Sequence, residues 1–443
     1  MIATETLSYH AEHARLHNGR STTVPAWLRE LRERGLKRFT ELGIPTTREE
    51  EWRFTNVAPL ATRSFKLSGD DAFASSRIEE IEELVKQATL DDDYQRLVFI
   101  NGSYSEQWSQ LHELPSGVIV ESLAQSIRSR PEAMEQLLVG DGVAEKSAFV
   151  SLNTAFVEDG ANVYVPDGVT LDRPIHLIFL SVASEPACCH PRNLISLGRN
   201  SRAAVIESYL GSECQSYFTN AVTKIELAEA AEFDHHKLQH EQPTTLHVAT
   251  TQVHQQTQSR CRSHYFSFGG DLARNELNCT LDGEGIECTL NGLYMPTGDQ
   301  LMDCRTEIHH TKPNCNSFEL YKGILDDRAK GVFNGKIHVY PDAQKTDAKQ
   351  SNQTILLSDD AIIDTKPQLE IYADDVRCTH GATVGELDEQ AIYYLRSRGI
   401  PADLARTMLI FAFANDVVQG VKLPAVRQHL ESILLSERGL PNV

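Results

Sequence analysis

The chain has 443 residues, 41% of them hydrophobic, and its 62 acidic and 42 basic residues give it a formal net charge of −20. So negative a charge argues against binding to nucleic acids or to anionic membranes, because both select basic surfaces. The length exceeds one ordinary hydrophobic core and predicts two or three structural units, unless an elongated repeat carries most of the chain.

The amino-terminal segment, residues 1–145, is expected to form a mixed and mainly helical domain. A helix is predicted from Pro25 to Leu42, since proline suits the first turn of a helix and Gly43 follows the last apolar residue of the stripe. A second helical stretch is expected from Arg77 to Leu90.

Two shorter signals lie in the same segment. Thr46 and Glu49 have the spacing of a capping box ahead of Trp52. The dipeptide Asn101-Gly102, which follows an apolar run, predicts a tight β-hairpin.

The central segment, residues 146–385, has the pattern of many short strands with almost no helical period. Phe333, Ile337 and Val339, for example, alternate with polar residues, which predicts one buried and one exposed face. Strand and turn units that recur without intervening helices fit a sandwich pair or a solenoid, and they favour a parallel β-helix, whose repeats stack over one continuous core.

The nine cysteines show no disulfide framework and no Cys-x-x-Cys spacing. Cys279, Cys288 and Cys304 lie in phase with apolar neighbours, so core packing is expected for them. Cys315 and the Cys188-Cys189 pair are predicted to be loop thiols. The amino terminus lacks a secretory pattern and no run approaches the ~20 apolar residues of a membrane helix, so a cytoplasmic protein is expected.

Histidines are concentrated between residues 235 and 264, where six of the 17 occur. Such density raises the possibility of a stand-alone metal-binding protein. Interspersed glutamines favour a solvated polar ladder instead, and the same interpretation applies to His309-His310.

A further pair of soft-metal ligands occurs where the β pattern ends. Cys378 and His380 are two residues apart in a strand-like run, so their side chains point to one face. Val376 shares that face, which keeps ordinary core packing open as an alternative for Cys378.

The last segment, residues 386–443, returns to a helical period. Asp388 is predicted to cap a helix that stops at Gly399, Pro401 opens a second helix with Leu404, Met408 and Phe411 on one stripe, and a third starts near Pro424. These helices either pack back on the strands or present a face to a partner.

The motifs of several enzyme classes are missing. The chain has no phosphate-binding Gly-x-x-x-x-Gly-Lys loop, no Gly-x-Ser-x-Gly elbow, no His-Glu-x-x-His and no dinucleotide fingerprint. We therefore expect it to bind no nucleotide and to have no catalytic residues of its own. The open alternative among enzymes is a β-helix protein that acts on carbohydrates through paired carboxylates or calcium.

An ordered series of motifs resembles the SufD family of iron–sulfur cluster assembly proteins. The motifs are GVFNGKIHV from 331, QKTDAKQ from 344, LLS from 356, PQLEI from 367, DDVRCTHGATVG from 374, YLRSRGI from 394 and, far upstream, EEWRFT at 50–55. The sister family SufB shares the core but typically lacks the Cys-x-His-Gly-Ala-Thr form, which favours SufD.

The resemblance implies a mainly β protein with a right-handed parallel β-helix core, flanked by the amino-terminal domain and the carboxy-terminal helices. It implies a scaffold subunit of a SufBCD complex that pairs with SufB through the β-helix and with the ATPase SufC through the helices, and that forms a homodimer when isolated. The residues expected to bind SufC are Tyr394, Leu395, Arg396, Arg398, Gly399, Leu404, Met408 and Phe411.

The resemblance also implies a role for the cysteine and histidine pair. A transient iron–sulfur cluster or iron would be held at the SufB interface, with His380 as a ligand and Cys378 beside it. Ligands drawn from two chains would make a labile site that can release its cluster.

Overall fold

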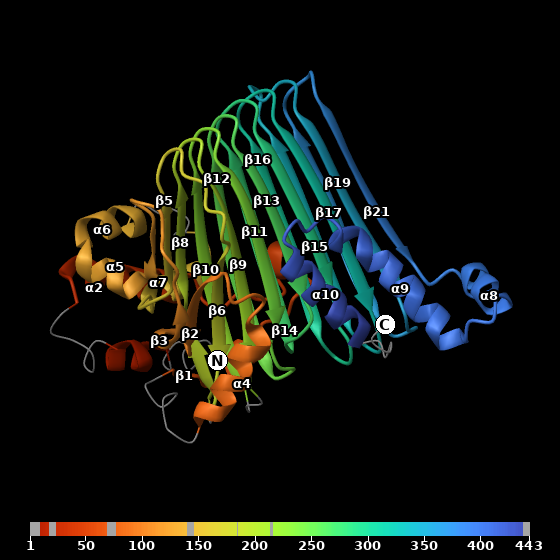
Figure 1. Cartoon of the computed structure of the whole chain (residues 1–443), viewed down its shortest axis with the longest axis horizontal. Coiled ribbons are helices and arrows are strands. Elements are labelled where there is room, and N and C mark those ends of the chain that lie inside the picture. Colours follow the sequence, from red (N-terminus) through yellow and green to blue (C-terminus); the bar gives the residue numbers. More distant parts are fainter. Residues whose placement is uncertain are drawn as a thin grey trace.

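The computed structural model describes residues 9–16, 24–68, 77–139, 146–183, 185–212 and 216–436. Two long, mostly parallel sheets face each other, with helices at one end and on the outer faces (Figure 1). The chain alternates between the sheets, as in a solenoid, so the predicted mainly β class with a parallel β-helix core is confirmed.

The strands of the two sheets follow one another in simple spatial order. The first sheet runs β20 (Ile362–Ile371), β18 (Lys330–Val339), β16 (Leu301–His310), β14 (Leu272–Leu281), β12 (Thr245–Gln255), β10 (Tyr217–Leu227), β8 (Arg192–Leu197), β5 (Ala161–Val165) and β4 (Ile119–Ser122), joined by β1 (Lys66–Leu67) and β7 (Ala187–Cys189). The second runs β21 (Arg377–Gly385), β19 (Asp347–Leu356), β17 (Asn316–Leu325), β15 (Glu287–Tyr294), β13 (Arg260–Ser267), β11 (Glu232–His240), β9 (Arg202–Gly211), β6 (Ile175–Ser181), β2 (Gln95–Ile100) and β3 (Ser103–Gln110).

The bore between the sheets holds the main core. Each solenoid strand pairs in register with the strand two ahead, so corresponding side chains stack along the axis. The rings of Phe99, Phe179 and Tyr209 stack in this way, with centroids 4.9 and 4.8 Å apart. Phe333 and Ile337, predicted to face inward, are fully buried.

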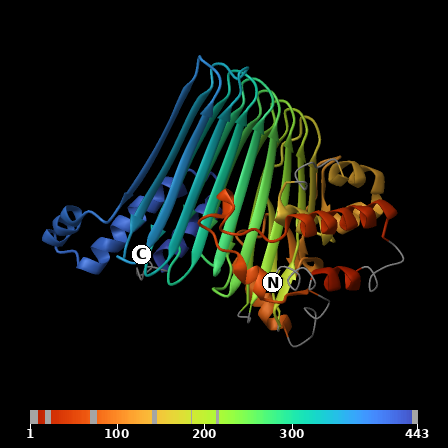
Figure 2. The same ribbon diagram turned by 180° about the vertical axis from the view of Figure 1, so that it is seen from behind.

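The amino-terminal helices lie around the β5 end of the solenoid (Figures 1 and 2). They are a helix over residues 9–16, α2 (Ala26–Leu42), α3 (Ala58–Thr62), α4 (Ile78–Ala88), α5 (Leu123–Ser129), α6 (Pro131–Val139) and α7 (Ala148–Ala155). The predicted α2 and α4 are confirmed. Phe39 of α2 and Phe149 of α7 share one core with Phe218 of β10 and Leu246 of β12, so these helices cover the outer face of the first sheet.

A buried cation fastens the segment around Trp52 to the same sheet. The guanidinium of Arg274 lies 3.4 Å from the Trp52 ring and 2.7 Å from the Asp303 carboxylate, and both charged side chains are fully buried. Arg274 also donates to the Glu51 carbonyl, and Thr55 donates to Asp303 at 2.5 Å. The EEWRFT motif is therefore the clamp that holds the amino-terminal region on the solenoid.

The carboxy-terminal helices cover the outer face of the second sheet. They are α8 (Glu389–Ser397), α9 (Ala402–Val418) and α10 (Pro424–Ser436), as predicted, and α8 projects beyond the end of the solenoid (Figure 1). Val417 and Leu430 pack with Ile206 and Leu238 of the sheet. The buried ammonium of Lys322 on β17 ties α9 down by donating to the Phe413 carbonyl at 2.9 Å and the Asp416 carboxylate at 2.6 Å.

Some local predictions held and others did not. The Asn101-Gly102 hairpin is confirmed, with φ of 50° and 82° at its two turn residues. The Thr46 and Glu49 box is half formed: Glu49 accepts the Thr46 N–H at 2.8 Å, but only the 3-10 turn η1 (Glu50–Trp52) follows. The boundary at residues 145 and 146 stays a prediction, although β2 lies before it and pairs in parallel with β6.

The predictions for several cysteines and histidines were wrong. Cys188 and Cys189 lie on β7 and not in a loop, whereas Cys315 lies in the turn before β17, as predicted; all three are buried. The histidine-rich stretch is not a solvated ladder, because most of its members lie within the sheets: His235, His236, His247 and His264 are at most 2% exposed, and His310 is fully buried. Cys279, Cys288 and Cys304 are core residues as predicted, whereas Cys214 lies outside the described residues. No helix in the described ranges has the length and apolar character needed to cross a membrane.

The clamp leads to a stability prediction. Arg274 also pairs with Glu276, so Asp303→Asn removes one of its two carboxylate partners, and it weakens the contacts of Asp303 with Arg305 and Thr55 as well. We therefore expect a loss of about 3 kcal/mol in the free energy of unfolding, together with faster proteolysis near residue 52. Asp299→Asn, at a fully exposed pair with Arg328, serves as the control and should leave urea unfolding unchanged. Equal effects of the two substitutions would contradict the clamp.

Candidate functional site

Within the part of the chain that the structure describes, the solenoid ends in two strands that each pair with one neighbouring strand. β20 pairs with β18 and β21 pairs with β19, and both lie at the end of their sheets (Figure 2). Apolar side chains are unusually exposed there, with exposed fractions of 56% for Ile362, 60% for Tyr372 and 49% for Val384. An edge with free backbone groups and exposed apolar residues is a template for another chain.

Cys378 lies on this end, on the face of β21 that continues the bore. Its register partner on β19 is the buried Ala348, and it packs with Val376 and Leu369 against a small apolar cluster. Desolvation raises the pKa of the Cys378 thiol. Because metals bind the thiolate, this environment favours a packing role until a cation or base arrives.

His380 lies two residues further on the same face, and its register partner is Gln350. The imidazole is exposed, unlike most histidines of the sheets. Nowhere in the described ranges do three or more His, Cys, Asp or Glu side chains form a group that could hold a metal ion. His380, with Cys378 beside it, therefore supplies at most two ligands.

Glu319 lies one strand further into the bore, in register with Gln350. The carboxyl is 4% exposed and accepts a hydrogen bond from the Gln350 amide. Desolvation raises the pKa of Glu319 to about 7, although Gln350 and Thr306 favour the ionised form. The sequence analysis missed this residue, because a glutamate at an inward strand position reads as an ordinary break in the apolar pattern.

The predicted SufC-binding residues lie on the projecting helix α8, in the turn that follows it and on α9. Tyr394 is 57% exposed and Met408 is 41% exposed. The Arg398 guanidinium lies 5.1 Å from the Tyr394 ring centroid and donates to its hydroxyl at 3.1 Å. Arg396 and Gly399 are exposed, whereas Leu395, Leu404 and Phe411 are half-buried. Phe411 packs against the apolar cluster between α9 and the second sheet. The predicted apolar stripe of Leu404, Met408 and Phe411 therefore faces the sheet at one end and solvent at the other.

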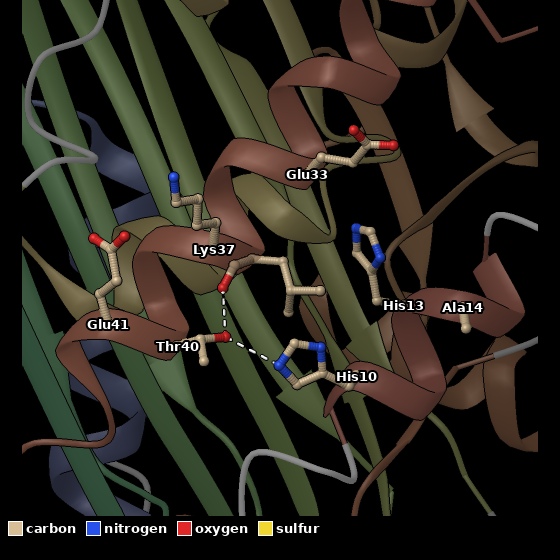
Figure 3. A pocket seen from close by; sticks show the side chains of 8 residues that line it. His10, His13, Ala14, Glu33, Lys37, Thr40 and Glu41 are labelled. Carbon is tan, nitrogen blue, oxygen red and sulfur yellow. Dashed lines mark hydrogen bonds between the residues drawn. The ribbon is translucent and has the colours of Figure 1, made fainter.

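A separate cavity of about 680 Å³ lies between the helix over residues 9–16 and α2. Figure 3 shows His10 and His13 on one wall and Glu33, Lys37 and Glu41 on the other. The His10 ring is hydrogen-bonded to the Thr40 hydroxyl at 3.0 Å. This cavity is at the opposite end of the solenoid from β21 (Figure 2) and adds no ligand to the His380 site.

Comparison with known proteins gives two family matches that together span most of the chain. Residues 5–177 match the family described as "SufBD protein N-terminal region", and residues 179–413 match "SUF system FeS cluster assembly, SufBD core domain". A Synechocystis protein named as an iron-sulfur cluster assembly SufBD family protein is 34% identical over 399 residues, covering 88% of this chain and 86% of that protein.

Two proteins named SufD are also similar. The Escherichia coli protein is 33% identical over 398 residues, or 89% of each chain. The Bacillus subtilis protein is 26% identical over 424 residues, covering 93% of this chain and 94% of the other.

The buried carboxyl generates a pH prediction. With its pKa raised from 4.5 to about 7, the stabilising contribution of neutral Glu319 is fully present below pH 4.5 and is lost as the pH rises through 7. Glu319→Gln should therefore be more stable than the wild type above pH 7 by up to about 3 kcal/mol, and the gain should shrink towards pH 4.5.

Urea unfolding between pH 5 and pH 8 measures this difference. Glu287→Gln, whose carboxylate on β15 is 52% exposed, is the control and should show no such gain. A Glu319→Gln gain that does not vary with pH would contradict the assignment.

Proposed function

Because this chain belongs to the SufBD family of iron–sulfur cluster assembly proteins, we propose that it is a non-catalytic scaffold subunit of a SufBCD complex in the cytosol. The observation that carries the proposal is the open end of the solenoid, where His380 is exposed on a strand that pairs with no second strand among the described residues. A scaffold of this kind assembles a cluster between subunits and then releases it.

SufB is the partner proposed for the open end. Exposed Ile362, Tyr372 and Val384 offer apolar contacts, and the free backbone groups of β20 and β21 can pair with strands of a second solenoid. In the absence of SufB, a second copy of this chain would meet the same requirement, so the isolated protein would form a homodimer.

Iron or a nascent cluster is the cargo held at this contact. Neutral imidazole is a good ligand for iron, and the exposed His380 needs little rearrangement to bind it. Cys378 has the less favourable environment, because its thiol is half-buried and its pKa is raised. SufB would supply the remaining ligands.

SufC is the partner proposed for α8 and the first half of α9, and its ATPase activity would supply the nucleotide chemistry that this chain lacks. Movement of α9 has a direct route to the cargo site. Lys322 joins α9 to β17, and β17 pairs with β19, which pairs with β21. A displacement of α9 would thus be transmitted to the open end through the β17–β19 and β19–β21 pairings.

The role of His380 can be tested in the complex co-expressed with SufB and SufC. His380→Ala removes a ligand without creating a cavity, because the side chain is exposed, so we expect an intact complex with at least a tenfold lower cluster content. Thr379→Ala, an exposed neighbour on the opposite face of β21, is the matched control. Visible absorption and iron analysis measure the cluster, and size exclusion checks assembly. Undiminished cluster in the His380→Ala complex would refute the proposed site.

The SufC contact predicts a different phenotype. Tyr394→Ala combined with Met408→Asp should leave the SufB contact intact and weaken SufC binding by tenfold or more, because an exposed aromatic anchor is lost and a charge enters an apolar contact. Co-purification yields measure both contacts. As a control, Tyr372→Ala at the open end should instead weaken the SufB contact. Normal SufC retention by the double variant would exclude this surface.

A further inference from the structure

Three side chains form a file along the inner face of the second sheet at its open end. Glu319 on β17, Gln350 on β19 and His380 on β21 are consecutive register partners. Neighbouring strands lie ~4.8 Å apart and corresponding side chains point to the same face. The exposed His380 imidazole therefore lies next to the buried Gln350 amide, which in turn lies next to the buried Glu319 carboxyl.

The amide is held in one orientation. Gln350 Nε2 donates to the Glu319 carboxylate, and the opposite strand leaves room for this amide at Gly335. A Cβ atom at Gly335 would lie 2.2 Å from Gln350 Nε2, so even alanine would displace the side chain. Gln350 Oε1 is buried and accepts no hydrogen bond within the described ranges. The next residue of the file, His380, carries the N–H group that can fill this vacant acceptor.

The carboxyl at the inner end of the file has no cationic partner among the described residues. Within the described part of the chain, no Lys, Arg or His side chain forms an ion pair with Glu319. Glu207, at another inward position of the bore, differs: it lies 3.1 Å from His235 and accepts hydrogen bonds from Tyr209 and Thr223. A buried carboxyl without a counter-charge destabilises the fold, and such groups are typical of functional sites.

We propose that Glu319 and Gln350 are positioning residues for His380: Gln350 orients the imidazole by accepting its N–H, and the Glu319 carboxylate supplies the negative charge that offsets a divalent cation bound at the opposite ring nitrogen. This inference rests on the proposed function, since it takes His380 to be a ligand of iron. Metal-binding histidines usually donate their second N–H to a carbonyl or carboxylate, and loss of that partner weakens metal binding about 10–100-fold. The raised pKa of Glu319 fits this role, because the carboxyl is neutral or charged according to what lies beside it.

Ferrous iron binding to the apo complex with SufB and SufC tests the proposal, by anaerobic equilibrium dialysis at pH 7.5. Glu319→Gln keeps the shape and removes the charge, so it should raise the dissociation constant about tenfold or more. Glu287→Gln, an exposed carboxylate on β15, is the control and should not change it. The double variant Glu319→Gln/Gln350→Glu returns one carboxyl to the file and should restore affinity to within about threefold of the wild type. If Glu319 only filled space, the second change, Gln350→Glu, would not restore iron affinity, because Gln and Glu have nearly the same size and neither substitution improves packing.

The outcomes separate this inference from the function on which it rests. Weak binding by His380→Ala together with normal binding by Glu319→Gln would overturn the role of the file and leave the ligand assignment standing. Normal binding by His380→Ala would overturn both. Weak binding by the double variant would overturn the role of the charge. Because Glu319→Gln should stabilise the fold at this pH, a loss of iron binding cannot be attributed to unfolding.

Discussion

The whole molecule depends on parallel strand pairing without slippage of register. From β8 to β19, each strand aligns residue for residue with the strand two ahead, and β6 aligns with β9, so inward side chains form columns along the bore. Side chains and backbone groups inside the solenoid contact a strand on each side. At β20 and β21, the last described strands of the two sheets, one of these neighbouring strands is missing. The end of the repeat is therefore the place where backbone groups and inward side chains are left open to contact another chain.

The columns also show how the surroundings of Cys378 and His380 differ, although both lie on the same face of β21. Cys378 continues a column that contains Cys261, Cys288, Ser317 and Ala348. The residues of this column are small and serve packing. In the neighbouring column, Leu290 is followed by Glu319, Gln350 and His380, so the last three layers before the open end are polar. We favour His380 as the ligand, because Gln350 and Glu319 follow it in its column, whereas small residues precede Cys378 and desolvation raises the pKa of its thiol.

Much of this architecture could be predicted from the sequence. Alternation at Phe333, Ile337 and Val339, the Asn101-Gly102 turn and the proline and aspartate signals of α8 to α10 are local, and local patterns survive in the fold. The burial of His264 was not predictable, because Gly420, which lies far away in the chain just after α9, packs close to its ring, and the His236 ring stacks on that of His264. Glu319 escaped notice for the same reason: its partner Gln350 is 31 residues away, and only the register brings them together. The ordered motifs predicted the family, and the register of the solenoid places the exposed His380 at one end of it.

The central claim is that this chain carries half of an iron site, which a second subunit completes. The most direct measurement is an anaerobic titration of the isolated chain with ferrous iron beside the same titration of the chain bound to SufB, each followed by gel filtration and iron analysis. The account predicts that the isolated chain retains no stoichiometric iron after gel filtration, while the pair retains iron in a His380-dependent way. Stoichiometric iron retained by the isolated chain, or by the pair without dependence on His380, would contradict it.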